Sequence, residues 1–159
     1  MAQNATPMWT DLRSKYFDIP RGPSFPQPTS ATEPWGAIME VGHAPAIVTT
    51  VAFSDGTASV VRSTGGGFFG GGDATVQEAR VAFLREAALA QPQSVHVTEF
   101  PHPGIGAVMF YFRSDSGVCS VSGLIEALGQ RGHPLNSLFV AASRILHEYL
   151  QLQKRTAEG

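Results

Sequence analysis

The most conspicuous candidate for chemistry is a glycine-rich segment, residues 65–72, in which two runs of three glycines flank Phe68 and Phe69. Read from Gly65 to Gly70, it satisfies a literal G-x-G-x-x-G pattern. In dinucleotide-binding folds this pattern joins a strand to a helix, and its backbone wraps a pyrophosphate at the helix N-terminus. Here too the segment follows a predicted strand and precedes a predicted helix.

Three features of the sequence oppose dinucleotide binding. The preceding strand belongs to a predicted hairpin and not to a parallel βαβ unit, the glycines lie several residues before the helix, and Asp73 puts a negative charge where a phosphate would sit. No Lys-Ser or Lys-Thr pair follows, as a P-loop requires. Two interpretations remain: a connection whose glycines take positive φ, or a loop that contacts a ligand or partner. The residues of that candidate loop are Gly65, Gly66, Gly67, Phe68, Phe69, Gly70 and Asp73.

His96, Glu99 and His102 are close enough in sequence to suggest a metal site. Strand geometry opposes it, because His96 and Glu99 are an odd number of residues apart and therefore point to opposite faces. His102 lies between two prolines in a predicted turn. We predict no metal site and no cofactor.

Cys119 is the one cysteine of the chain, so it forms no internal disulfide, which is typical of a reducing cytoplasm. It shares a strand face with Val121 and is expected to pack as a small hydrophobic residue. A nucleophilic cysteine needs an activating base, and none is identifiable in the sequence. The carboxylates at turns and strand ends are dispersed, and the sequence does not show which converge: Glu40, Asp55, Asp73, Glu99 and Asp115. No catalytic residue is assigned.

The composition excludes some classes of partner. Of 159 residues, 43% are hydrophobic and only 15% are charged, which favours additional burial such as an oligomer interface. The formal net charge of -2 provides no basic surface for nucleic acid. We read no signal peptide at the N-terminus, and no apolar run is long enough to cross a bilayer. The expected location is the cytoplasm, without nucleic-acid or membrane partners.

The first half of the chain shows one helical pattern followed by three strand patterns. Thr6 can cap a helix that starts at Pro7 and ends near Phe17, and a proline-rich strap follows. Strands are predicted for residues 35–41, 46–53 and 58–63, and the Asp-Gly pair at residues 55–56 favours a tight hairpin between the last two.

In the second half, Thr75 and Glu78 form a possible capping box for a helix that stops before Pro92. Strands are predicted for residues 95–100, 105–113 and 117–122, the last two joined by a compact turn. An amphipathic final helix begins near Pro134, and residues after Lys154 are expected to fray.

The strands that start at Ala46 and Ala107 carry apolar side chains on both faces, so both faces of the sheet need cover. We therefore predict an α+β fold, a three-layer α/β/α arrangement with a five- or six-stranded, mainly antiparallel sheet. Residues 1–34 would form a helix and strap docked on a core domain, residues 35–153, with residues 154–159 as a frayed C-terminus.

The order of elements, helix, three strands, helix, three strands, helix, resembles the profilin-like layout, which includes the roadblock and dynein-light-chain group of small modules. That resemblance implies that the terminal helices cover one face of the sheet and the middle helix the other. The chain is also similar to a group of small bacterial proteins of unknown function. This second similarity lies in Trp35-Gly36, in the two triple-glycine runs, and in Val108-Met109-Phe110-Tyr111.

The leading hypothesis is a non-enzymatic protein-interaction or regulatory module, a homodimer whose interface uses the middle helix, residues 75–90, or an adjacent strand edge. The alternative is a small-molecule-binding or sensor domain with a pocket between the glycine-rich segment and the sheet. An enzyme of unknown class is the third hypothesis. Its only nameable participants are His96, Glu99, His102 and Cys119.

Overall fold

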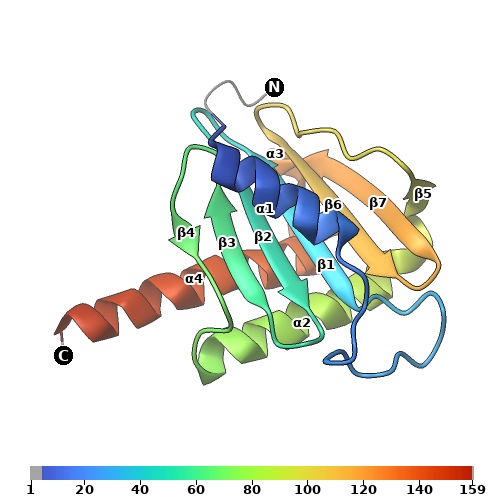
Figure 1. Ribbon diagram of the computed structural model, residues 1–159. Helices are drawn as coiled ribbons and strands as arrows, with labels where there is room; N and C mark the ends of the chain where they lie inside the picture. The colour runs from blue at the N-terminus through green and yellow to red at the C-terminus, as the bar shows by residue number, and fades with distance from the viewer. Residues whose placement is uncertain (1–4, 159) are drawn as a thin grey trace.

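The computed structural model describes residues 5–158 and shows an α+β fold (Figure 1). The helices are α1 (Pro7–Asp18), α2 (Ala74–Ala90), α3 (Ile125–Leu128) and α4 (Asn136–Glu158), with a 3-10 turn, η1 (Gln91–Gln93), after α2. The strands are β1 (Gly36–Gly42), β2 (Ile47–Phe53), β3 (Ala58–Arg62), β4 (Gly67–Phe68), β5 (Val95–Val97), β6 (Ala107–Ser114) and β7 (Gly117–Leu124).

All strands join one open sheet in the order β4-β3-β2-β1-β6-β7-β5, and every neighbouring pair is antiparallel. The antiparallel sheet is thus confirmed. The sheet has seven strands and not five or six, because the glycine-rich segment, predicted as a connection or a ligand or partner loop, supplies the short edge strand β4. At the other edge, β5 is three residues long and shorter than predicted.

The first helix follows its sequence signals. The Thr6 hydroxyl accepts a hydrogen bond from the backbone N–H of Trp9 at 3.2 Å, and Pro7 occupies the first turn, where its missing N–H costs no intrahelical bond. Trp9, Tyr16 and Phe17 are buried. The predicted helix start is therefore confirmed.

The predicted hairpin between β2 and β3 is also confirmed. The N–H of Phe53 donates to the carbonyl of Thr57 at 2.9 Å, which closes the turn. Gly56 has a φ of 107°, a left-handed conformation that glycine adopts without a Cβ clash. This antiparallel pairing excludes the parallel βαβ setting of a dinucleotide-binding loop.

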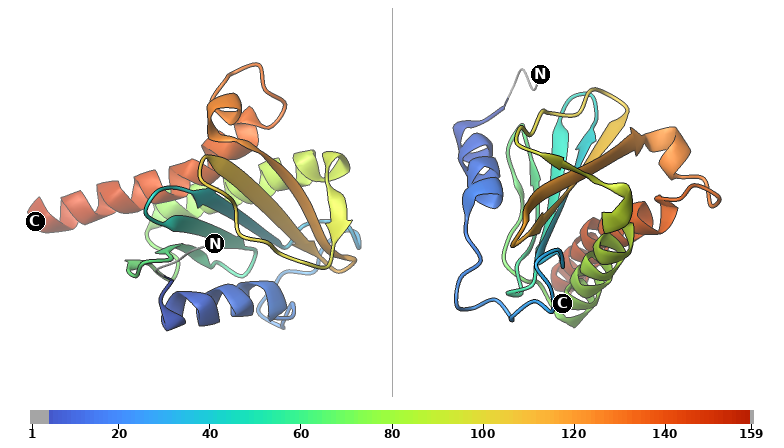
Figure 2. Two further views of the ribbon diagram at one scale, coloured as in Figure 1. Left: turned by 90° about the horizontal axis from the view of Figure 1, so that it is seen from above. Right: turned by 90° about the vertical axis from the view of Figure 1, so that its right-hand side faces the viewer.

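Helices lie on both faces of the sheet (Figure 2). α2 and α4 pack side by side on one face over a cluster that includes Phe83, Phe110 and Ile145. α1 lies on the other face over a cluster that includes Trp35 and Tyr111. The middle and C-terminal helices therefore share a face, whereas the profilin-like layout pairs the two terminal helices.

α4 extends to Glu158, so the helix continues past Lys154, where the sequence predicted fraying. Its C-terminal end extends beyond the sheet on the side of β4 (Figures 1 and 2). Leu150 is 43% exposed at this overhang. Within residues 5–158, no helix combines the length and hydropathy needed to cross a bilayer.

Candidate functional site

The glycine-rich segment runs along β3 as an edge strand. The N–H of Arg62 donates to the carbonyl of Gly66 at 3.1 Å, and the N–H of Ala58 donates to that of Gly70 at 2.7 Å. A Cβ on Gly67 would lie 2.2 Å from the carbonyl oxygen of Val60, closer than any real contact. At this position glycine is required for backbone pairing, which is a structural role.

The two phenylalanines of the segment point to opposite sides, as neighbouring residues of a strand do. Phe68 stacks on Tyr149 of α4, with ring centroids 4.9 Å apart and planes 10° from parallel. Phe69 is 51% exposed and lies with Met8 and Leu12 around a small hollow beside α1. Only Phe68 faces α4.

Asp73 is the N-cap of α2, so the predicted Thr75–Glu78 capping box is wrong. Its carboxylate accepts hydrogen bonds from the N–H groups of Thr75 at 3.0 Å and Val76 at 3.1 Å. The Thr75 hydroxyl, the Val76 N–H and the guanidinium of Arg155, 2.7 Å away, hold the pKa of Asp73 below its usual range. This carboxylate fills the helix N-terminus that a phosphate would use.

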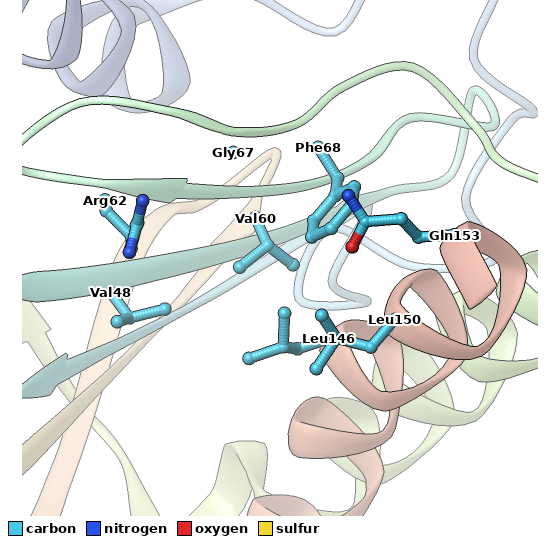
Figure 3. A pocket seen from close by; sticks show the side chains of 8 residues that line it. All are labelled: Val48, Val60, Arg62, Gly67, Phe68, Leu146, Leu150 and Gln153. Atoms are coloured by element: carbon cyan, nitrogen blue, oxygen red, sulfur yellow. The ribbon is translucent and has the colours of Figure 1, made fainter. Parts of the chain in front are cut away.

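A pocket of about 440 Å³ lies between the β2–β3–β4 side of the sheet and the C-terminal half of α4 (Figure 3). Val48, Val60, Leu146, Leu150 and Phe68 supply apolar walls, and Gly67 supplies backbone; the polar lining side chains are Arg62 and Gln153. In Figure 3 the two leucines of α4 point from below toward the strand side chains. Of the seven residues predicted for the candidate loop, only Gly67 and Phe68 line this pocket.

Of the four residues named for an enzyme, the structure brings Cys119 and His96 together and leaves Glu99 and His102 apart from them. Cys119 pairs in register with His96 of β5 on the α2 side of the sheet, and its sulfur accepts from the side-chain amide of Gln91 at 3.7 Å. His102 lies on the opposite side of the sheet, edge-on to Trp9 at 5.3 Å between ring centroids. Burial and the charge of Arg13 lower the pKa of His102. Glu99 is exposed.

Sequence reasoning missed a buried ion pair beneath α1. Glu40, in the middle of β1, is fully buried and its carboxylate receives both Nε and a terminal nitrogen of Arg13 at 2.7–3.1 Å. The Thr49 hydroxyl donates to the same carboxylate at 2.8 Å and accepts from the indole of Trp9 at 3.3 Å. The sequence contained a signal for this pair, because a carboxylate within an apolar strand needs a cationic partner when it is buried.

This ion pair links α1 and the loop after β5 to the sheet. Arg13 also donates to the carbonyl of Phe100 at 2.7 Å, and its guanidinium lies 4.9 Å from the ring centre of Phe17. Beside it the hydroxyl of Tyr111 donates to the carbonyl of Pro101 at 2.9 Å. Burial, followed by the charge of Glu40, raises the pKa of Tyr111 to about 12. The polar groups are satisfied by one another, which indicates a structural role.

The outer face of the α2–α4 helix pair carries exposed apolar side chains. Val81, Leu89 and Val140 are 49%, 67% and 57% exposed, respectively. Shallow grooves between the helices connect Val81 to Val140 and share Arg85 and Arg144 as lining residues. This face therefore combines exposed apolar and charged side chains.

Within residues 5–158, no three His, Cys, Asp or Glu side chains are grouped closely enough to hold a metal ion. The structure thus offers two candidate sites for binding: the pocket beside β4 and the outer face of α2 and α4. Comparison with protein-family models, with curated proteins and with solved structures gives no match to this chain.

Proposed function

We propose that this chain is a non-enzymatic protein-interaction or regulatory module that acts as a homodimer. The exposed apolar side chains of Val81, Leu89 and Val140 on the outer face of α2 and α4 support this proposal. Val81 and Leu89 lie eight residues apart on α2, a spacing that places them in one stripe along the helix. Association of two such faces removes this apolar surface from water.

The charges on this face favour a second copy of the same chain as the partner. Arg85 and Arg144 line the grooves together with Glu78 and Glu86. In a two-fold symmetric interface, residue i of one copy meets residue j of the other and the reverse, so a face with both signs of charge is complementary to itself. Low overall charge, 15% of residues, agrees with such burial.

We also propose a three-layer arrangement of helices and sheet. The order of elements along the chain supports a relationship to the profilin-like layout. The pairing of α2 with α4 departs from that layout. The proposed compartment is the cytoplasm, supported by the lone thiol of Cys119.

Sedimentation-velocity ultracentrifugation of the wild type, Val140→Glu and Ile105→Glu tests the dimer. We expect a wild-type dimer that Val140→Glu weakens by roughly 100-fold or more, since burying an unpaired carboxylate costs several kcal/mol. Ile105, 80% exposed in the loop before β6, is the matched control and should leave the dimer intact. A monomeric wild type at high concentration, or equal effects of both variants, would contradict the proposal.

The second candidate function is a small-molecule-binding or sensor domain, favoured by the pocket of about 440 Å³ that Gly67 and Phe68 line. This volume lies in the usual range for ligand sites, roughly 300–1,000 Å³. A thermal-shift screen of metabolites tests it, because a ligand that binds only the folded chain raises its melting temperature. The candidate is rejected if no compound raises that temperature in the wild type. It is also rejected if the compounds that do so raise it equally in Leu146→Trp, which fills the pocket.

A further inference from the structure

We infer that the pocket between β2, β3, β4 and α4 binds a small amphipathic monoanion, a carboxylate attached to an apolar chain or ring. This inference rests on the second candidate function, the ligand-binding domain, and adds the chemical class of the ligand. Three properties of the pocket carry it: an apolar floor, an exposed arginine at the rim, and a limited volume.

The floor of the pocket is apolar and protected from water. Val60 is 2% exposed, and Val48 and Leu146 on either side of it are partly buried. A polar group placed here would lose its hydration without gaining a hydrogen bond, which is unfavourable. The body of the ligand is therefore apolar.

The wall formed by Phe68 is fixed from behind. Its ring stacks on Tyr149, whose hydroxyl in turn donates to the backbone carbonyl of Ala58 in β3. Gly67 pairs with Val61 in the strand ladder, so the backbone that carries Phe68 is also held. A preformed wall reduces the ordering cost of binding.

The rim gives the pocket its charge preference. Arg62 and Gln153 are both exposed, and among the described residues Arg62 is the only charged side chain that lines the pocket. Within residues 5–158 no carboxylate lines it, and Arg62 takes part in none of the ion pairs. A guanidinium binds a carboxylate through two parallel hydrogen bonds, and the side-chain amide of Gln153 offers a further donor.

The volume limits the size of the ligand. A water molecule occupies about 30 Å³ of the liquid, so 440 Å³ corresponds to roughly fifteen groups of that size. An eight-carbon carboxylate with about ten non-hydrogen atoms fits this space. Its chain would lie between Val60 and Leu146, with the carboxylate at Arg62.

Isothermal titration calorimetry of the full chain with sodium octanoate and with octan-1-ol tests the inference. We expect octanoate to bind and octan-1-ol, which has the same chain without the charge, to bind at least tenfold more weakly. Arg62→Gln should weaken octanoate binding roughly tenfold or more through loss of a charge-assisted hydrogen-bond pair. Arg131→Gln, a change at an exposed arginine in the loop between α3 and α4, is the matched control and should bind octanoate normally.

Leu146→Trp, checked for folding by circular dichroism, should abolish binding of both compounds by filling the pocket. If octan-1-ol binds as well as octanoate and Arg62→Gln changes nothing, the charged ligand class is overturned while the ligand-binding function stands. If octanoate does not bind, or binds Leu146→Trp normally, the inference is overturned. If Leu146→Trp does not fold, the comparison of octanoate binding by Arg62→Gln and Arg131→Gln still tests the inference.

Discussion

Replacement of Arg13 by Met tests the role of the buried ion pair in holding α1 on the sheet. Glu40 is 0% exposed, and without Arg13 the hydroxyl of Thr49 is its remaining side-chain partner. Breaking a buried pair by removing one partner costs about 3–5 kcal/mol. This is a large share of the roughly 5–15 kcal/mol that stabilises a typical domain.

Urea unfolding monitored by tryptophan fluorescence measures this loss, since both tryptophans, Trp9 and Trp35, are buried on the α1 face. With a slope of about 2 kcal/mol per M urea, a loss of about 4 kcal/mol lowers the midpoint by about 2 M. Arg21→Met breaks the more exposed pair between Arg21 and Asp115 and serves as control. It should lower the midpoint much less.

The double variant Arg13→Met/Glu40→Met separates a buried charge from lost packing. With both charges gone, most of the stability should return, apart from about 1 kcal/mol each for the Thr49 hydroxyl, which loses its acceptor, and the Phe100 carbonyl, which loses its donor. A loss below about 1 kcal/mol in Arg13→Met would refute the reasoning. So would a double variant as unstable as the single one.

Two further predictions concern the close backbone contact at Gly67 and the stability of the protein at alkaline pH. Gly67→Ala should lower the melting temperature more than Gly104→Ala, because a Cβ at Gly67 would lie 2.2 Å from the carbonyl oxygen of Val60, whereas nothing lies within 4 Å of one at Gly104. Equal shifts by calorimetry would contradict this. The raised pKa of Tyr111, about 12 against 10.0, means that its stabilising contribution is full below pH 10 and is lost as the pH rises toward 12. Tyr111→Phe should therefore lose less stability than the wild type between pH 10 and 12 in urea titrations, and parallel losses would count against the assigned burial.

Sequence patterns predicted secondary-structure elements correctly where the contacts that determine those elements are local. The caps and turns at Thr6, Pro7 and Gly56 involve residues within a few positions along the chain, so neighbouring residue types suffice to identify them. The apolar strands β2 and β6 are buried along most of their length, as their two-sided apolar patterns predicted. The α2 cap was misassigned because Asp73 and Thr75 are both capable cap residues two positions apart.

The candidate sites depended on contacts between distant parts of the chain. Residues that line the pocket range from Val48 to Gln153, and they meet only because α4 lies across the sheet beside the edge strand. Arg13 and Glu40 are 27 positions apart on different elements. No spacing rule relates such residues, since their distance is set by packing and not by helix or strand period.

By itself the sequence determined the α+β class, the antiparallel hairpin and the limits of the first helix, because local hydrogen bonds and hydrophobic period decide these features. Only the tertiary structure decided that the glycine-rich segment pairs as a strand, that α2 and α4 share a face, and that Glu40 is buried against Arg13. Those outcomes follow from how the elements pack together, and the pocket and the exposed helix face are products of the same packing.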